Sequence, residues 1–421
     1  MPDRIRLEAM QIANDLRRAR KLVQRVLRGR RSLAELKQAL EARPPLPTGH
    51  YEVGVYFADG PVNLYQMRQW YAPLRELSKT HPVLVLTRGA SAALALMRES
   101  GLDVAYTRRI GEIEELLAEQ RLGIMLYVNQ NARNFQMMRY GTLWHVFVSH
   151  GESDKIYMAS NQNKAYDYSF IGGDAARERL TRALWDYDVD RRTFAIGRPQ
   201  NDHLQGEPPF APDDRTVVFY APTWEGDRPS MSYGSVASHG EALVRRLLET
   251  GRHRVVYRPH PRSGVSDPEY GAANERIIAM IAEANRKDPA ANHVFDQSPS
   301  IDWQLSLPDV AVCDVSAMVY DRLATGKPLM VTRPVAEEAE VDEIGYLGVC
   351  EWLYADDALR GDEALERVIG DEAARERLGT WSRHYFGDTS PGAPTARFHE
   401  AVETLLARAE EWRSREAAGT L

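Results

Sequence analysis

Two histidines are the residues of this sequence best suited to proton transfer or phosphate binding. His150 ends the apolar run "VFVSH", and Gly151 after it lets the backbone turn sharply. An imidazole there can accept a proton near neutral pH, or it can be held at the turn by structural hydrogen bonds. His260 lies in "VVYRPHPRSG", where each proline restricts the preceding residue to extended geometry. With Arg258 and Arg262 it forms a cationic cluster that could hold a phosphate, unless the arginines are simply solvated.

A third motif, "VAVCDVSAMVYD", combines an apolar run with the start of a helix. Asp314 ends the run, Ser316 is placed to cap the helix, and Gly326 follows the expected helix end. A helix N-terminus attracts phosphate, although an ordinary capped helix would look the same. Asp321 lies about one turn into this helix. Since a carboxylate repels phosphate, we expect it to accept hydrogen bonds from hydroxyl groups.

A fourth motif, "TVVFYAPTWEGD", ends another apolar run at Thr223. The glycines, serines and proline of residues 225–240 predict a flexible loop, either beside a substrate or on plain surface.

These motifs follow strand-like runs that alternate with helical patterns, which predicts an α/β fold with parallel sheets. In such folds, ligands bind at the carboxyl ends of the strands. A chain of 421 residues is long for one core, so we expect two domains. The proline-rich, acidic stretch at residues 204–214 is the best boundary. The predicted divisions are a basic helical segment with linker (1–48), an N-terminal α/β domain (49–205), a C-terminal α/β domain (214–390) and a C-terminal helix (391–421).

Composition excludes several classes of protein. A net charge of −7 argues against a general nucleic-acid binder. Two cysteines, Cys313 and Cys350, make no disulfide framework and indicate a reducing, cytoplasmic location. We expect neither a signal peptide nor a membrane-spanning segment. No cluster has the spacing of a structural metal site, although a divalent ion at a phosphate-binding site stays open.

Residues 1–31 carry ten arginines and lysines against three acidic residues, with apolar residues near helical spacing. This pattern fits a basic amphipathic helix on an anionic membrane surface. It fits equally well a helix packed on the protein itself with its charges solvated.

Together the motifs "VSHGESDK", "GRPQNDHL", "FYAPTW", "YRPHP" and "CDVSAMVYD…KP" resemble those of the CDP-glycerol glycerophosphotransferases, the teichoic-acid and capsule polymerases, over residues 120–335. The resemblance implies a GT-B fold, in which two Rossmann-like domains face a central cleft. The N-terminal domain would lie on the acceptor side and the C-terminal domain would bind the donor. The resemblance also implies peripheral attachment to the membrane. Two features depart from the family pattern. Ala317 replaces a second serine, and Ser149, Glu152 and Asp154 surround the "HG" pair.

The resemblance also implies roles for individual residues. His150 falls on the histidine thought to act as catalytic base, and His260 on the histidine at the donor phosphates. The donor-binding residues implied or predicted are Arg258, Ser316, Asp321, Thr223 and Asp314.

Three functions remain open from the sequence. The first is transfer of glycerol phosphate, or a similar alditol phosphate, from a CDP-activated donor to a hydroxyl of a polymer or lipid-linked acceptor. The second is a GT-B glycosyltransferase using a nucleotide sugar, which would share the same fold. The third is a non-catalytic relative that binds an anionic polymer.

Overall fold

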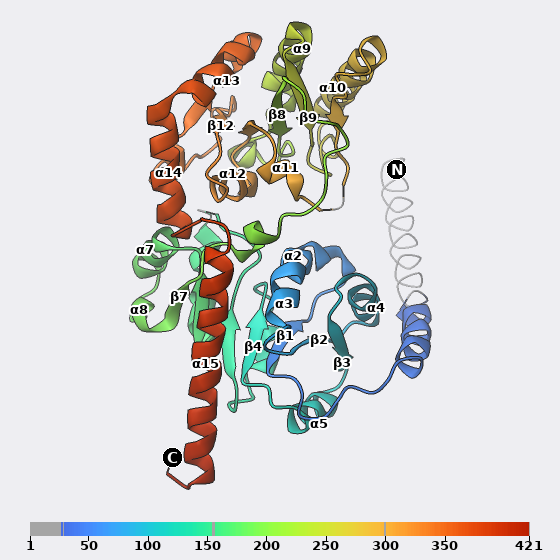
Figure 1. Cartoon of the computed structure of the whole chain (residues 1–421), viewed down its shortest axis with the longest axis vertical. Helices are drawn as coiled ribbons and strands as arrows, with labels where there is room; N and C mark the ends of the chain where they lie inside the picture. The colour runs from blue at the N-terminus through green and yellow to red at the C-terminus, as the bar shows by residue number, and fades with distance from the viewer. Residues whose placement is uncertain (1–26, 28, 154–155, 299, 421) are drawn as a thin grey trace, which may run out of the picture. The chain divides into compact units, whose positions relative to one another are not determined.

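The computed structural model describes residues 27, 29–153, 156–298 and 300–420, which form an α/β structure (Figure 1). They fall into two compact units, one of Met1–His150 with Glu403–Leu421 and the other of Gly151–Val402. The boundary predicted at residues 204–214 lies between strands β7 and β8, within the second of these units. The predicted division of the chain therefore stays a prediction. The basic helix predicted for residues 1–31 lies largely outside the described residues.

The first unit contains five parallel strands in the order β3-β2-β1-β4-β5. They are β1 (Val53–Phe57), β2 (Val83–Thr87), β3 (Asp103–Tyr106), β4 (Ile124–Tyr127) and β5 (Trp144–Phe147). Every residue of β1, β2 and β4 is buried, as expected of parallel strands covered on both faces. Figure 1 shows helices beside these strands. The helices are α2 (Leu64–Arg68), α3 (Tyr71–Leu77), α4 (Ala90–Glu99), α5 (Ile110–Glu119) and α6 (Asn134–Met137).

The second unit contains a six-stranded parallel sheet in the order β10-β9-β8-β11-β12-β13. Its strands are β8 (Thr216–Ala221), β9 (His253–Tyr257), β10 (Val294–Phe295), β11 (Val310–Cys313), β12 (Leu329–Thr332) and β13 (Glu351–Leu353). The same unit holds the parallel pair β6 (Tyr168–Ile171) and β7 (Thr193–Ala195), with α7 (Asp174–Ala183) and α8 (Val189–Arg192).

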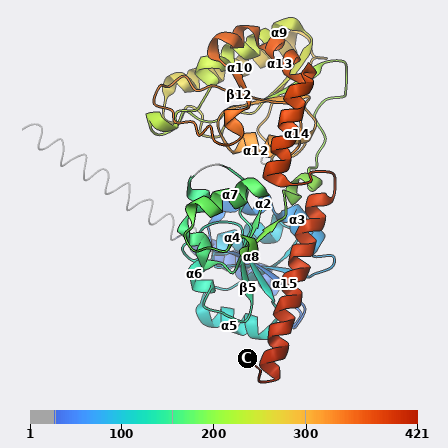
Figure 2. The same ribbon diagram turned by 90° about the vertical axis from the view of Figure 1, so that its left-hand side faces the viewer.

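Both faces of the six-stranded sheet are covered. Val218 and Tyr220 join one apolar core, whereas Val217 and Phe219 join another, because successive side chains of a strand point to opposite faces. Figure 2 shows α9, α10 and α13 on one side of β12 and α12 on the other. The first group is α9 (Glu241–Thr250), α10 (Pro268–Lys287) and α13 (Gly361–Gly370), and the second is α11 (Trp303–Ser306), α12 (Ala317–Leu323) and α14 (Glu372–Phe386).

The last helix, α15 (Ala393–Ala417), matches the charged helix expected near the C-terminus. In the first unit its end packs on the start of β4. A Cβ atom at Gly123 would lie 3.0 Å from Leu406 Cδ2 and 3.2 Å from Ala409 Cβ, so a side chain there would crowd the helix. Arg413 Nη2 donates to the Leu122 carbonyl at 2.7 Å.

The flexible loop predicted for residues 225–240 is shorter than expected. Val236–Gly240 forms a turn of π-helix in which Val236 and His239 are buried. Because a carbonyl oxygen only accepts, His239 Nε2 carries a proton and donates it to the Leu353 carbonyl at 3.1 Å, which fixes the ring.

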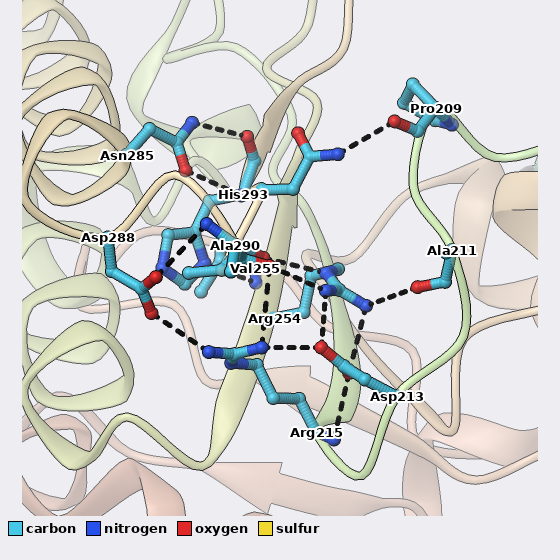
Figure 3. Close-up of polar contacts among 12 residues, drawn as sticks. Pro209, Ala211, Asp213, Arg215, Arg254, Val255, Asn285, Asp288, Ala290 and His293 are labelled. Carbon is cyan, nitrogen blue, oxygen red and sulfur yellow. Dashed lines mark hydrogen bonds and ion pairs between the residues drawn. The ribbon is translucent and has the colours of Figure 1, made fainter.

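The stretch at 204–214 is fastened to the second sheet by a buried arginine (Figure 3). Arg254, on β9, is 2% exposed and makes two hydrogen bonds to the Asp213 carboxylate at 3.1 and 2.7 Å. Its guanidinium also donates to the carbonyls of Ala211 and Ala291 and lies 4.4 Å from the centre of the Phe210 ring. This planar, five-donor group is used in a way that lysine cannot reproduce.

We therefore predict that Arg254→Lys lowers the free energy of unfolding by about 2 kcal/mol, because carbonyls and a carboxylate lose their donors. The matched substitution Arg286→Lys, at a side chain 74% exposed, should change it by less than about 0.5 kcal/mol. The measurement is urea unfolding. Equal stability of the two variants would contradict the prediction.

Candidate active site

His150 lies in the first unit, in the loop after β5, with its ring held at a defined angle. Its Nδ1 is 3.2 Å from the Val128 carbonyl oxygen, and the Tyr65 ring meets it edge to face at 5.8 Å between centres. Because a carbonyl oxygen only accepts, Nδ1 carries the proton in this hydrogen bond. The basic lone pair is then on Nε2, as a general base requires.

The backbone before His150 is strained. Ser149 has a φ of 54°, a left-handed conformation that costs a non-glycine residue free energy. The Trp70 indole N–H donates to the Ser149 carbonyl at 2.5 Å and stabilises this turn. Trp70 is thus a contributor to the site that sequence reasoning missed.

A buried amide cluster lies at the same edge of the first sheet and was also missed. Asn129, just after β4, donates through Nδ2 to Asp59 and to Gln66, each at 2.7 Å. Its own carbonyl accepts from Asn134 Nδ2 at 2.7 Å. Asn129 directly follows Val128, whose carbonyl holds the His150 ring. The cluster therefore fixes the backbone that positions the imidazole. Polar residues directly after the runs "VGVYFA" and "IMLYV" were the available signal.

In the second unit, Asp321 pairs with an arginine of the "GRPQND" motif. Arg198 Nη2 lies 2.7 Å from Asp321 Oδ1, and both side chains are about 90% buried. A Cβ atom at Gly151 would lie 3.7 Å from Arg198 Nη1, so the "HG" glycine adjoins the same guanidinium. Three of the predicted motifs therefore meet at Arg198. The prediction that Asp321 accepts from substrate hydroxyls is not tested by this contact.

Glu152, one of the departures from the family pattern, is paired as well. Its carboxylate contacts the Arg179 guanidinium and accepts from the Ser153 N–H at 3.0 Å. Only about a tenth of either side chain in the pair is exposed. The acid therefore adds little uncompensated charge beside the "HG" motif.

His260 stacks on an aromatic ring. The rings of His260 and Trp224 are 6.4 Å apart at 28°, and the Arg262 guanidinium lies 3.7 Å from the centre of the Trp224 ring. His260 Nδ1 accepts from the Arg262 backbone N–H at 3.1 Å, so Nε2 carries the proton of the neutral ring. Burial, followed by the charge of Arg262, lowers the pKa of His260 below its usual value, although Glu225 opposes this. His260 is thus arranged as a neutral hydrogen-bond donor.

Glu225 holds the loop that carries this arrangement. Its carboxylate accepts from the backbone N–H groups of Gly264 (2.9 Å), Ser266 (2.6 Å) and Asp267 (3.0 Å). Burial alone would raise the pKa of Glu225, but these backbone hydrogen bonds outweigh it and hold the pKa below the usual value. Glu225 directly follows Trp224, so it ties the "YAPTW" motif to the loop after "RPHP".

Arg258 is occupied by protein groups. It donates to Asp296 Oδ2 at 2.6 Å and to the Ser298 carbonyl at 2.9 Å. Gln304 Nε2 donates to the same carboxylate oxygen at 2.8 Å. These hydrogen bonds show that Arg258 stabilises the loop after β10. Its contact with the donor stays a prediction.

Asp314 is fully buried and joins three segments. Its carboxylate accepts from the N–H groups of Thr223 (2.7 Å) and Ser235 (3.0 Å) and from the Thr332 hydroxyl (2.6 Å). Burial raises the pKa of Asp314 to about 6, although hydrogen bonds from Ser235, Thr332 and Thr223 oppose the shift. With no exposed surface, it orients the site through Thr223; direct contact with a donor stays a prediction.

Ser316 caps α12 as the sequence predicts. Its hydroxyl accepts from the Met318 N–H at 3.3 Å, and Gly326 after the helix has a φ of 65°. The carboxyl ends of three neighbouring strands thus carry the predicted residues of this unit. Thr223 follows β8, His260 follows β9, and Asp314 and Ser316 follow β11. His150 belongs to the other unit, and its action on the same substrate stays a prediction.

Residues 148–342 match the family model of CDP-Glycerol:Poly(glycerophosphate) glycerophosphotransferase. The match covers slightly less than half of the chain. The predicted resemblance is confirmed, and so is the assignment as a CDP-glycerol glycerophosphotransferase-like transferase. No curated protein matches the chain.

Solved structures agree with the predicted GT-B-like α/β fold. The wall teichoic acid polymerase TagF, in a variant soaked with CDPG, has a TM-score of 0.54 at 12% identity, covering 94% of this chain and 98% of that one. A putative UDP-N-acetylglucosamine 2-epimerase from Listeria monocytogenes has a TM-score of 0.52 at 15% identity, covering 82% and 94%. The glycotransferase of kitacinnamycin has a TM-score of 0.51 at 15% identity, covering 86% of this chain and 100% of that one. At these identities the similarity shows the fold alone.

The described residues contain no membrane-spanning helix and no metal-binding cluster. None of their helices is long and apolar enough to cross a membrane. In the same part of the chain, no group of three or more His, Cys, Asp or Glu side chains could hold a metal ion.

We predict that Asp314 makes the stability depend on pH. Because its pKa is about 6 when folded and about 3.8 when unfolded, the folded state binds more protons between these values. The free energy of unfolding should therefore fall by up to about 3 kcal/mol as the pH rises from about 4 to 6. Asp314→Asn keeps an acceptor for both N–H groups and should remove this step. Urea unfolding across this pH range measures it.

The exposed Asp227→Asn is the control and should keep the wild-type profile. Asp314→Ala should also lack the step and, because it leaves buried N–H groups unpaired, should be about 3 kcal/mol less stable than Asp314→Asn at all these pH values. A wild-type slope in Asp314→Asn would refute the assignment.

Proposed function

We propose that this chain transfers glycerol phosphate, or a similar alditol phosphate, from a CDP-activated donor to a hydroxyl of a cell-envelope polymer or lipid-linked acceptor, and releases CMP. One observation carries the proposal: the family match at 148–342 contains every predicted site residue, from His150 to Asp321.

In this reaction the acceptor hydroxyl attacks the phosphorus that bears glycerol. A new P–O bond forms, the bond to the other phosphate breaks, and CMP leaves with its electron pair. His150 takes the hydroxyl proton on Nε2. The Val128 hydrogen bond at Nδ1 supports this role, because it fixes the tautomer with the lone pair on Nε2.

The donor phosphates bind at His260 and at the start of α12. The neutral His260 offers its Nε2–H, and Arg262 adds positive charge nearby. Preorganised donors of this kind account for most of the catalysis in phosphoryl transfer. Thr223 and Asp321 orient the glycerol or ribose hydroxyls.

The acceptor side of the proposal includes the membrane. Residues 1–31 attach the protein to the anionic inner face of the cell membrane, where a lipid-linked or growing polymer is presented. Their ten basic residues support this.

A GT-B glycosyltransferase would have the same fold, so the fold does not separate the two reactions. The family match favours the CDP-alditol donor. Stabilisation of the protein by UDP-sugars, without stabilisation by CDP-glycerol, would favour the glycosyltransferase instead.

We predict that purified protein releases CMP from CDP-glycerol when a polyol-phosphate oligomer is supplied as acceptor. His150→Ala should lower kcat about 1000-fold with little change in the donor KM, because only proton transfer is lost. His260→Ala should lower kcat/KM about 100-fold. The measurement is steady-state release of CMP.

His81→Ala is the matched control, because His81 precedes β2 at the opposite end of the strands and contacts Glu52 at 2.8 Å. It should keep wild-type activity. Full activity in both site variants would overturn the assigned roles, and turnover of no donor would favour a binding protein.

A further inference from the structure

A cavity of about 340 Å³ lies in the second unit, among α7, α14 and residues 342–345. This volume falls within the range of small-molecule sites, about 300–1,000 Å³. Buried Ala175 and Tyr385 form its floor, and Ile344, 72% exposed, lies at its mouth. None of the residues assigned to donor binding lines it.

One wall of the cavity is aromatic. Trp381 meets the His384 ring edge to face at 5.4 Å and packs beside Tyr385 at 6.1 Å. Trp381 is only partly buried, so part of this wall is open to a ligand. An indole of this kind offers a flat apolar surface together with a polar N–H.

The rim carries both signs of charge. Arg179 and Arg182 come from α7, and Glu178 comes from the same helix. Asp342 faces them from the loop after β12. An anion would meet the two carboxylates and a cation the two guanidinium groups. Sugar hydroxyls, which both donate and accept, match such a mixed rim, while the C–H face of a pyranose matches an aromatic wall.

The cavity is linked to the "HG" motif through Arg179. The Glu152 carboxylate contacts this guanidinium, and Glu152 directly follows Gly151. A Cβ atom at Gly172 would lie 3.1 Å from Glu152 Oε2 and 2.7 Å from the Tyr385 carbonyl oxygen, so Glu152 and α14 lie close together. The acid that departs from the family pattern thus fixes one wall of this cavity.

We propose that this cavity binds an uncharged pyranose of the acceptor, stacked on Trp381 and hydrogen-bonded by Arg182, Glu178 and Asp342. That this sugar belongs to the acceptor rests on the proposed function, whereas the binding of a saccharide in the cavity does not.

Saturation-transfer NMR with N-acetylglucosamine and with glucose tests the proposal on the full chain without any donor. At least one sugar should receive saturation at its ring C–H protons. Trp381→Ala should weaken binding at least about tenfold, while Trp381→Phe, which keeps an aromatic face, should retain most of it. Trp185→Ala, at a tryptophan 87% exposed in the same unit, should bind as wild type does.

Arg182→Ala provides a second test in case Trp381→Ala fails to fold, because Arg182 is exposed and its loss should not disturb the core. This variant should also weaken binding. Wild-type affinity in both Trp381→Ala and Arg182→Ala would overturn the proposal, as would the absence of saturation transfer from wild type to either sugar. CMP release without sugar binding overturns this inference alone. Sugar binding without CMP release overturns the proposed function and leaves the saccharide site intact.

Discussion

The buried carboxylate of Asp314 is the interaction on which the carboxyl-end edge of the six-stranded sheet depends. Asp314 directly follows β11. Its carboxylate accepts hydrogen bonds from the Thr223 N–H after β8, from the Ser235 N–H before the π-helix and from the Thr332 hydroxyl on β12. These strands are neighbours in the parallel sheet, so one side chain fixes three of their carboxyl-end connections. Thr223 is placed directly, and Trp224 and Glu225 follow it along the chain. Through them the position of His260 depends on the same carboxylate.

Most arginines near the predicted motifs are occupied by acids of the protein. Arg198 pairs with Asp321, Arg258 with Asp296, and Arg179 with Glu152. Each pair holds a loop or helix in place and leaves little net charge. Arg262 differs, since its guanidinium lies on the Trp224 ring. The proposed recognition of donor phosphates therefore depends on a neutral imidazole N–H, backbone N–H groups and one stacked guanidinium.

The sequence predicts the strands well because they are buried on both faces and form continuous apolar runs between turn residues. It also predicts the Ser316 cap and the position of Gly326, which depend on local geometry. Contacts between distant segments were not predictable. Nothing near Asp321 points to Arg198, 123 positions away, and the neighbours of Glu152 give no sign of Arg179. The short edge strand β13 was missed because it has only three residues, two of them half-buried.

The proposed donor site requires His260 to meet the donor as a neutral ring with its proton on Nε2. Nitrogen-15 NMR of the histidine side chains, with His260 assigned from its absence in His260→Gln, tests this directly. At pH 7 we expect an unprotonated Nδ1 and a protonated Nε2, with the Nε2 signal moving when CDP-glycerol is added. A doubly protonated His260 at that pH, or a signal that CDP-glycerol does not move, would contradict it.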